Sequence, residues 1–210
     1  ESDLGAVESV TKTIGENLNG YKIICTKSTV PVGTGKWIED IIRTIQPKAD
    51  FDYVSNPEFL REGAAIKDFM HPDRVVIGTR TSKALDVMRE VYRALYINET
   101  PILSTSVETA EMVKYASNAF LALKISYINE IANLCEEVGA DVHEITRAMG
   151  LDGRISPKFL HPGPGFGGSC FPKDMYSLAA AGRKNNSPLF TIEAAIKTNV
   201  SQKTRMLGKL

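Results

Sequence analysis

The hydrophobic pattern of the first hundred residues predicts helices and short strands in alternation. Apolar residues at helical spacing indicate an amphipathic helix, and they are Val7, Val10, Ile14 and Leu18. Short apolar runs, which predict strands, follow at residues 21–28, 52–56 and 74–79. Helices are expected between them, at residues 36–45 and from near Pro57. Because strands separated by helices pair in parallel and are covered on both faces, the pattern predicts a doubly wound α/β sheet.

A long helical pattern occupies residues 106–139. Its apolar positions recur at threes and fours and are Met112, Ala116, Phe120, Leu123, Tyr127, Ile131 and Leu134. A helix this long is expected to link two domains or to pack on a partner subunit. Further helices are predicted at residues 141–150, from Pro172 and from near Pro188, with a Gly/Pro-rich loop at residues 161–170. The second half of the chain is therefore expected to be all-α.

The composition narrows the function classes. The 210 residues carry 25 basic and 25 acidic side chains, so the net charge of zero gives no reason to expect nucleic-acid or membrane partners. No apolar run approaches the ~20 residues of a membrane-spanning helix. Cys25, Cys135 and Cys170 are odd in number and lack metal-ligand spacing. We therefore expect no disulfide framework, no bound metal and a cytoplasmic location.

The beginning of the chain predicts that a longer protein contains it. The first residue is Glu1 rather than Met, and the opening residues already have a helical pattern. A sheet that binds a dinucleotide should carry a G-x-G-x-x-G turn after its first strand, but no such turn follows any of the predicted strands. Either the sheet binds no dinucleotide, or that turn lies upstream of Glu1, which the helical pattern at the start favours.

Cys170 ends the Gly/Pro-rich loop and is the sharpest chemical candidate. The glycines before it let the backbone approach a ligand closely. Pro172 suits the first position of a helix, which would place Cys170 at or just before the N-cap. There the helix dipole and Lys173 would favour the nucleophilic thiolate. A small packing cysteine after a glycine turn is an equally weighted alternative.

Acidic and hydroxyl side chains lie where they could assist such chemistry. Asp174 is four residues beyond the cysteine and could act as a base or orient a water, although spacing alone favours compensation of the helix dipole. Glu58 and Glu62 follow a strand at the edge where such sheets bind ligands, or they form a charged helix start. Ser28 and Thr29 follow the preceding strand and could bind a ligand or tie down the turn.

Basic and amide side chains give further candidates. Lys114 and Asn118 share one face of the long helix and could stabilise an oxyanion, with a solvent-exposed lysine as the default alternative. Arg154 and Lys158 flank the glycine loop and could bind phosphate. His161 has no visible triad partner, so we interpret it as a loop contact rather than a base.

Taken in order, these segments resemble the UDP-glucose/GDP-mannose dehydrogenase family. The matching motifs are KSTVPVG (27–33), NPEFLREG (56–63), KDFMHPDRVVIG (67–78), VKYASNAF (113–120) and GFGGSCFPKD (165–174). The resemblance extends from about residue 20 to the C-terminus, and the last motif is highly specific. It implies the C-terminal part of a Rossmann-like NAD-binding domain over residues 1–104. The long helix would join this to a helical, 6-phosphogluconate dehydrogenase-like central domain over residues 105–210, which forms homodimers or higher homo-oligomers through that helix.

The resemblance also implies sets of site residues. The catalytic set is Cys170, Lys114, Asn118, Asp174, Glu58 and Thr29. The residues implied to contact NAD are Ser28, Thr29, Val30, Glu62 and Lys173. The residues implied to contact a UDP-sugar are Glu58, Phe59, Leu60, Arg61, Lys114, Asn118, Arg154, Lys158, His161, Gly165, Phe166 and Gly167.

The implied chemistry is the oxidation of the C6 alcohol of UDP-glucose to UDP-glucuronate with two molecules of NAD. Cys170 would add to the intermediate aldehyde as a thiohemiacetal, which a second oxidation converts to a thioester that water hydrolyses. Lys114 and Asn118 would stabilise the oxyanion, and Asp174 would orient the water. Thr29 and Glu58 would order a water and act as acid or base.

Rival interpretations remain open at this point. Inside the family, the substrate could be GDP-mannose or UDP-N-acetylmannosamine, although the motif GPGFGGSCFPKD favours UDP-glucose. In a different class, the isolated chain could be a non-catalytic dimerisation module. A thiol acyl-transferase using Cys170 is a third possibility, but no histidine is placed to serve as its base.

Overall fold

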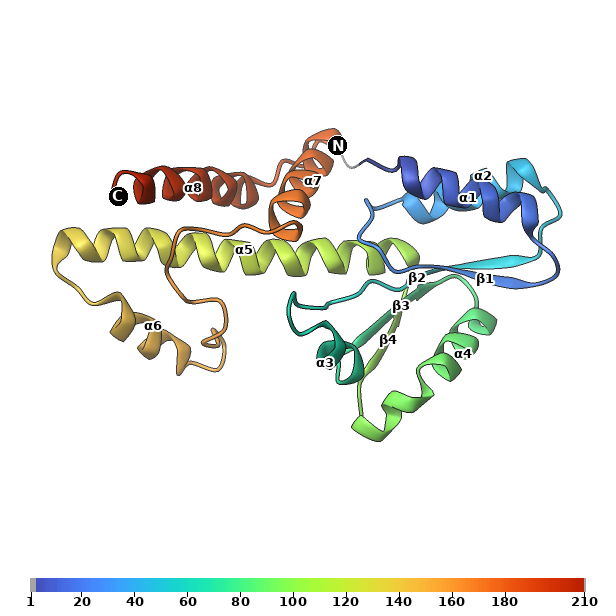
Figure 1. Cartoon of the computed structure of the whole chain (residues 1–210), viewed down its shortest axis with the longest axis horizontal. Helices are drawn as coiled ribbons and strands as arrows, with labels where there is room; N and C mark the ends of the chain where they lie inside the picture. Colours follow the sequence, from blue (N-terminus) through green and yellow to red (C-terminus); the bar gives the residue numbers. More distant parts are fainter. Residues whose placement is uncertain (1–2, 210) are drawn as a thin grey trace. The chain divides into compact units, whose positions relative to one another are not determined.

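The computed structural model describes residues 3–209, apart from the side chains of residues 96–98. The chain divides into two compact units, one ending at Lys114 and the other beginning at Tyr115. The first unit contains α1 (Gly5–Asn17), β1 (Lys22–Thr26), α2 (Thr34–Ile45), β2 (Phe51–Ser55), α3 (Ala65–Met70), β3 (Val75–Thr79), α4 (Ser82–Val91), the 3-10 helix η1 (Arg93–Asn98) and β4 (Ile102–Thr105). Helix α5 (Val107–Val138) begins in the first unit and continues into the second, as one unbroken helix in Figure 1. The second unit also contains α6 (Val142–Gly150), α7 (Cys170–Lys184) and α8 (Phe190–Leu207).

The four strands form one sheet in the order β1-β2-β3-β4. The predicted parallel pairing is confirmed for β1 with β2 and for β3 with β4. It is wrong for β2 and β3, which pair antiparallel over two residue pairs. The connection between these two strands, residues 56–74, contains the six-residue α3 and returns the chain to the sheet so that β3 runs opposite to β2. Strand β4 was not predicted, because its four residues mix apolar and hydroxyl side chains.

Thr26 at the end of β1 pairs with Ser55 at the end of β2. Because the two strands are parallel, the segments that leave them start side by side at one edge of the sheet. This is the edge at which open α/β sheets bind ligands. The predicted fold class, α/β followed by all-α, is therefore confirmed.

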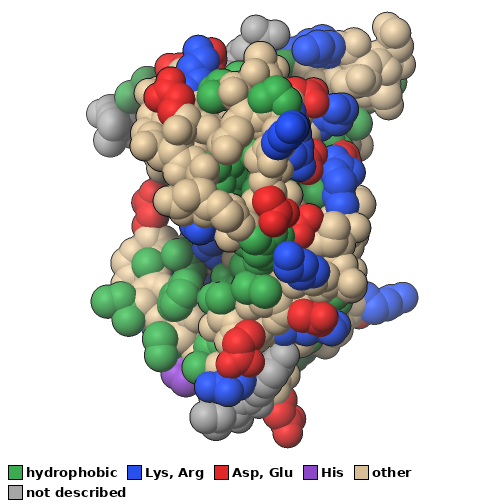
Figure 2. Space-filling model, turned by 90° about the vertical axis from the view of Figure 1, so that its right-hand side faces the viewer, with side chains coloured by type: hydrophobic (Ala, Val, Ile, Leu, Met, Phe, Trp, Pro, Cys, Tyr) green, Lys and Arg blue, Asp and Glu red, His purple; other side chains and the backbone are tan. Residues whose placement is uncertain are grey.

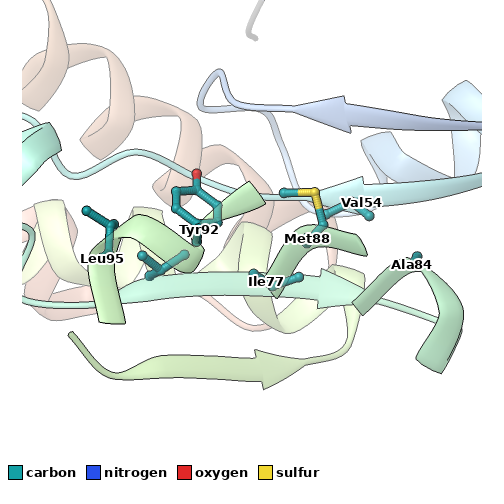
Figure 3. Close-up of a cluster of buried hydrophobic side chains, with 7 residues drawn as sticks. Val54, Ile77, Ala84, Met88, Tyr92 and Leu95 are labelled. Atoms are coloured by element: carbon teal, nitrogen blue, oxygen red, sulfur yellow. The ribbon is translucent and has the colours of Figure 1, made fainter. Parts of the chain in front are cut away.

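Two apolar clusters hold the first unit together. One packs α4 and η1 on β2 and β3, and its buried members are Val54, Val75, Ile77, Ala84, Met88, Tyr92 and Leu95 (Figure 3). The other packs α2 and the start of α5 on β2, and its buried members are Ile38, Ile42, Ala49, Phe51, Tyr53 and Val107. Gly78 in β3 permits the close approach of α5, because a Cβ there would lie 2.5 Å from the Ala110 Cβ and 2.7 Å from the Ser106 carbonyl oxygen. Strand β3 therefore packs closely against the first turn of α5.

In the second unit an apolar cluster forms where α7 and α8 pack on α5. Its buried members are Tyr115, Ala119, Ala122, Phe166, Met175, Leu178 and Ala195. Phe166 comes from the glycine loop, so this loop is anchored in the core rather than detached from it.

The face that α5 buries differs from the apolar stripe in its sequence. Five of the buried side chains on this helix are polar, namely Glu111, Lys114, Asn118, Ser126 and Asn129. Meanwhile much of the stripe is exposed, including Met112, Phe120, Tyr127 and Leu134. The buried polar groups find hydrogen-bond partners on other segments, whereas the stripe leaves large apolar side chains in solvent.

Two expected helix starts are wrong. Residues 56–61 form an irregular segment instead of the helix expected near Pro57, and the next helix along the chain is α3. Cys170 is the first residue of α7, with Ser169 at the N-cap, so Pro172 occupies the third helical position and not the first. Proline is tolerated there because backbone N–H groups of the first turn have no partner within the helix. Within residues 3–209 no helix combines the length and apolar character needed to cross a membrane.

Candidate active site

The loop that leaves β1 exposes Ser28 and partly exposes Thr29, whereas Val30 is buried. A turn fixes the far end of this loop, because the hydroxyl and the backbone N–H of Thr34 both donate to the carbonyl of Pro31, at 2.6 and 3.1 Å. Ser28 and Thr29 are therefore accessible on a loop whose far end is fixed.

A buried hydrogen-bond network underlies the segment that leaves β2. Asn56 is 1% exposed, and its side-chain amide donates to the Val76 carbonyl at 2.7 Å. Its side-chain oxygen accepts from the Lys27 ammonium at 2.9 Å and from the Tyr92 hydroxyl at 2.5 Å. Figure 3 shows the ring of Tyr92 in the apolar cluster with its hydroxyl directed away from the labelled aliphatic side chains. This network joins the ends of β1 and β2 to the helical layer.

Glu58 and Lys114 are both predicted site residues, and they form an ion pair in this unit. The Lys114 ammonium lies 3.1 Å from the Glu58 carboxylate, with the lysine side chain 6% exposed and the glutamate side chain 30% exposed. The same lysine lies 5.4 Å from the ring centre of Phe59, and the Arg74 guanidinium lies 3.7 Å from that ring. A nearly buried ammonium is thereby held between a carboxylate and an aromatic face.

In the second unit Cys170 is exposed at the start of α7, where its sulfur lies 3.7 Å from the Ser169 hydroxyl. Asp174, one helical turn further on, is 1% exposed and accepts a 2.6 Å hydrogen bond from the side-chain amide of Asn118. The other oxygen of Asp174 has no hydrogen-bond partner in the structure, and the Lys173 ammonium lies 3.6 Å from it. An exposed thiol thus precedes a buried carboxylate by four residues.

Amide side chains of α5 and α8 hold the glycine loop. The Asn199 side chain forms two hydrogen bonds with the backbone of Phe166. It accepts from the N–H at 2.7 Å and donates to the carbonyl at 3.0 Å. Gly165 adopts φ 105°, and a Cβ there would lie 2.4 Å from the Asn199 side-chain oxygen. Two further amides fix Gly163: the Asn129 oxygen accepts from its N–H at 2.8 Å, and Gln202 donates to its carbonyl at 2.8 Å. These hydrogen bonds fix residues 163–166 of the loop that leads to Cys170.

Two of the predicted substrate-binding cations pair with carboxylates of their own unit. Arg61 forms a bidentate contact with Asp68, and Arg154 forms one with Asp152 two residues before it. The hydrogen bonds from Arg61 lower the pKa of Asp68 to about 2, and those from Arg154 lower the pKa of Asp152. Lys158 and His161 are exposed. The described residues contain no cluster of His, Cys, Asp or Glu able to hold a metal ion. On the face drawn in Figure 2, acidic and basic side chains are interspersed.

Comparisons with known proteins cover nearly the whole chain. Residues 1–96 match the NAD binding domain of the UDP-glucose/GDP-mannose dehydrogenase family, and residues 108–201 match its central domain. The chain belongs to this family. It is 53% identical over its full length to the UDP-glucose 6-dehydrogenase of Rhizobium meliloti (strain 1021), covering 48% of that protein. It is 51% identical to the UDP-glucose 6-dehydrogenase TuaD of Bacillus subtilis (strain 168), again over its full length, covering 45% of that protein.

Among solved structures, the fold resembles that of a UDP-glucose dehydrogenase from the hyperthermophilic archaeon Pyrobaculum islandicum. The TM-score is 0.90 at 38% identity, with 95% of this chain and 46% of the archaeal chain covered. The chain spans about half the length of the curated relatives it matches. The predictions of the family and of NAD as the cofactor of its first domain are confirmed.

Several residues that form contacts around the predicted site residues were not themselves predicted as site residues. They are Lys27, Asn56, Arg74, Tyr92, Glu111, Asn129, Asn199 and Gln202. For those on α5 a signal existed, because Glu111 and Asn129 share a face with Lys114 and Asn118. Lys27, Asn56 and Arg74 lie within the quoted motifs, but their contacts are with residues elsewhere in the sequence, which the motifs do not reveal.

Proposed function

We propose that these residues form the core of an NAD-dependent nucleotide-sugar 6-dehydrogenase that oxidises UDP-glucose to UDP-glucuronate. The observation that carries this proposal is the exposed Cys170 at the start of α7, one turn before the buried pair of Asp174 and Asn118. An exposed thiol is accessible to a bound sugar, and a carboxylate one turn away can direct a water toward the sulfur adduct. The named relatives support the nucleotide sugar.

The edge of the sheet at β1 and β2 fits a contact with part of NAD. Ser28 and Thr29 present hydroxyls there, on a loop whose shape the Thr34 turn maintains. We propose that Ser28, Thr29 and Val30 contact the cofactor from this unit, with Glu62 and Lys173 as further contacts. When bound, NAD would accept a hydride in each of the two oxidations.

The role of Cys170 is to hold the half-oxidised sugar. Its thiolate adds to the C6 aldehyde carbon, forming a C–S bond while the carbonyl oxygen becomes an alkoxide. After the second oxidation the adduct is a thioester. Attack by water then breaks the C–S bond, releasing the carboxylate and returning the thiolate. The net reaction converts one alcohol, one water and two NAD+ to one carboxylate, two NADH and three protons.

The charged and amide groups would act around this sulfur chemistry. Lys114 and Asn118 stabilise the alkoxide that forms on the sugar, because charge that develops during reaction gains most from fixed donors. Glu58, already paired with Lys114, accepts the proton of the C6 hydroxyl together with a water held by Thr29. Asp174 orients the water that cleaves the thioester.

Contacts with the sugar nucleotide would come from two segments. The first is the segment after β2, with Glu58, Phe59, Leu60 and Arg61. The second is the loop of Gly165, Phe166, Gly167 and His161, together with Arg154 and Lys158, whose charges suit phosphate. To bind the nucleotide, Arg61 must release the carboxylate of Asp68. Arg154 must likewise release that of Asp152.

We further propose a homodimer that buries the exposed stripe of α5. Phe120, Tyr127 and Leu134 follow one another at intervals of seven residues and are 60, 46 and 57% exposed. That repeat is the spacing at which one helix packs against another. The proposed location is the cytoplasm, where the three free cysteines would remain reduced.

The deciding experiment is an NADH assay of the full-length enzyme that carries these residues, with UDP-glucose, GDP-mannose and UDP-N-acetylmannosamine compared. We expect two NADH per UDP-glucose consumed. Oxidation of GDP-mannose or UDP-N-acetylmannosamine in preference would reassign the substrate, and no NADH with any of the three would refute the proposed function. The 210 residues alone are expected to yield no NADH, because none of their strands is followed by the glycine turn that binds the pyrophosphate.

A further inference from the structure

Glu111 on α5 is a buried carboxylate that the proposed chemistry does not use. The residue is 2% exposed, and both carboxylate oxygens accept hydrogen bonds from backbone N–H groups. One accepts from Gly33 at 2.7 Å and the other from Gly35 at 2.8 Å. Because Gly33 is the N-cap of α2 and Gly35 its second residue, a side chain of one helix caps the first turn of another.

The two glycines are suited to this contact. Gly33 adopts φ 96°, a left-handed conformation that residues with a Cβ rarely take. At Gly35 a Cβ would lie 2.5 Å from the Tyr53 ring and 2.6 Å from a Val107 methyl group. A larger residue at either position would therefore move α2 away from the carboxylate.

Through these amides Glu111 controls the loop that leaves β1. Gly33 ends that loop, and the neighbouring Thr34 holds the Pro31 carbonyl with both its hydroxyl and its N–H. Val30 is buried at 4% exposure, so it cannot reorient without loss of packing. The conformation of residues 28–33 thus depends on where Glu111 places the start of α2.

The same helix also holds the segment that leaves β2. Lys114 lies one helical turn after Glu111, and its ammonium pairs with Glu58 at 3.1 Å. A continuous helix keeps these two side chains at a fixed separation. The first turns of α5 therefore set the position of one loop relative to the other.

We propose that Glu111 is a positioning residue that presents the 28–33 loop to NAD and keeps it in register with Lys114. This inference rests on the proposed function, because it assumes that Ser28, Thr29 and Val30 contact the cofactor. Glu111 itself is enclosed by protein and acts through the loop.

The electrostatic surroundings make this contact sensitive to pH. Burial is the main cause that raises the pKa of Glu111, the nearby Glu108 raises it further, and the two glycine N–H groups and Arg80 lower it. Burial raises the pKa of Tyr53 on β2, and the charges of Glu111 and of Glu39 on α2 raise it further. The ionised carboxylate can accept both hydrogen bonds. Protonation of the Glu111 carboxylate places an O–H opposite one of the two N–H donors and weakens that hydrogen bond. The loop should therefore loosen as pH falls through the raised pKa of Glu111.

The first test uses NMR on the 210-residue chain and needs no cofactor. The amide protons of Gly33 and Gly35 should titrate together, with an apparent pKa above the ordinary glutamate value. In Glu111→Gln this shared titration should vanish, because the amide cannot ionise. Glu108→Gln is the matched control: it removes the same charge on the same helix, where Glu108 accepts from Arg80 at 2.8 Å, and it should leave the titration in place. Amides that do not titrate in the wild-type chain would overturn the inference even if the variant failed to fold.

The second test uses the full-length enzyme. Glu111→Gln replaces one acceptor by an NH2 group that faces an N–H, so we expect the KM for NAD to rise about tenfold. The KM for the nucleotide sugar should change much less, and Glu108→Gln should resemble the wild type. In the wild type the KM for NAD should rise toward acid pH, and this dependence should be absent in Glu111→Gln. A variant that loses only kcat, or loses stability with an unchanged KM for NAD, would overturn the positioning role.

The two tests separate this inference from the proposed function. If the wild-type enzyme reduced no NAD with any nucleotide sugar, the proposed function would fail and the cofactor role of Glu111 would fail with it. The titration of the two glycine amides would still show whether Glu111 holds the loop.

Discussion

The side-chain amide of Asn118 donates a 2.6 Å hydrogen bond to the carboxylate of Asp174, and both side chains are buried. The contact joins α5 to the second turn of α7, 56 residues apart in sequence. The second carboxylate oxygen lacks a hydrogen-bond partner in the structure and lies 3.6 Å from the Lys173 ammonium. A buried carboxylate with a spare acceptor is costly for folding, and it is also what a water-orienting group requires.

Replacement of Asn118 by alanine should lower the stability of the chain. The variant leaves the Asp174 carboxylate buried with neither oxygen hydrogen-bonded, which should reduce the free energy of unfolding by about 1–3 kcal/mol. Urea denaturation followed by circular dichroism measures this. Asn17→Ala serves as the control, because the Asn17 amide is exposed and donates to the Thr13 carbonyl one turn back. Equal effects of the two substitutions would contradict the importance of the buried pair.

Replacement of Cys170 by serine in the full-length enzyme should stall the second oxidation. A serine hydroxyl is a much weaker nucleophile than a thiolate, so the aldehyde should not proceed to a thioester. We expect release of free UDP-glucuronate to fall by at least ~100-fold, a magnitude usual for the loss of a catalytic group. Chromatography of the products measures this. Cys135→Ser, which alters a buried cysteine on α5, controls for the general effect of removing sulfur. Normal release of UDP-glucuronate by Cys170→Ser would exclude the thioester route.

A charge placed on the exposed stripe of α5 should dissociate the proposed dimer. In Phe120→Glu each copy would bring a carboxylate into an apolar interface, where an unpaired charge is strongly disfavoured. Sedimentation velocity should show the wild-type chain as a dimer and the variant as a monomer. Leu151→Glu is a suitable control, because Leu151 is 83% exposed and follows α6 rather than lying on the stripe. A wild-type chain that sedimented as a monomer at high concentration would argue against this surface.

Arg61 and Asp68 predict a pH effect with a definite sign. The hydrogen bonds from Arg61 hold the pKa of Asp68 at about 2, below its ordinary 3.8. A carboxyl whose pKa is lowered by folding stabilises the fold above its unfolded value, and that contribution is lost as pH falls toward 2. In an NMR titration the Asp68 carboxyl should respond near pH 2, and in Arg61→Gln it should return toward its ordinary value. The same response in both proteins would show that the ion pair does not form in solution.

Local pattern was sufficient for most of the elements. The spacing of apolar residues over 106–139 predicted a single helix, and α5 indeed runs from Val107 to Val138. The helix at 141–150 was equally well marked, because Asp141 caps it from its own side chain. Such features depend on neighbours within a few residues, and these are visible in the order of the amino acids. The motif around Cys170 was also visible as a sequence, although its roles remain predictions.

Long-range packing decided the rest. Nothing in residues 51–55 or 75–79 indicated that β2 and β3 would pair antiparallel, because strand direction depends on how the intervening chain returns to the sheet. The apolar stripe of α5 predicted a helix that links two domains or packs on a partner subunit, and Phe120 and Tyr127 on this stripe are exposed in the single chain. The sequence did not show which polar residues of this helix would be buried with its apolar ones, and among them Glu111 meets Gly33 at a separation of 78 residues. Burial of a charge is tolerable only where distant segments supply its hydrogen bonds, and that match exists in the folded chain and not in any local stretch of sequence.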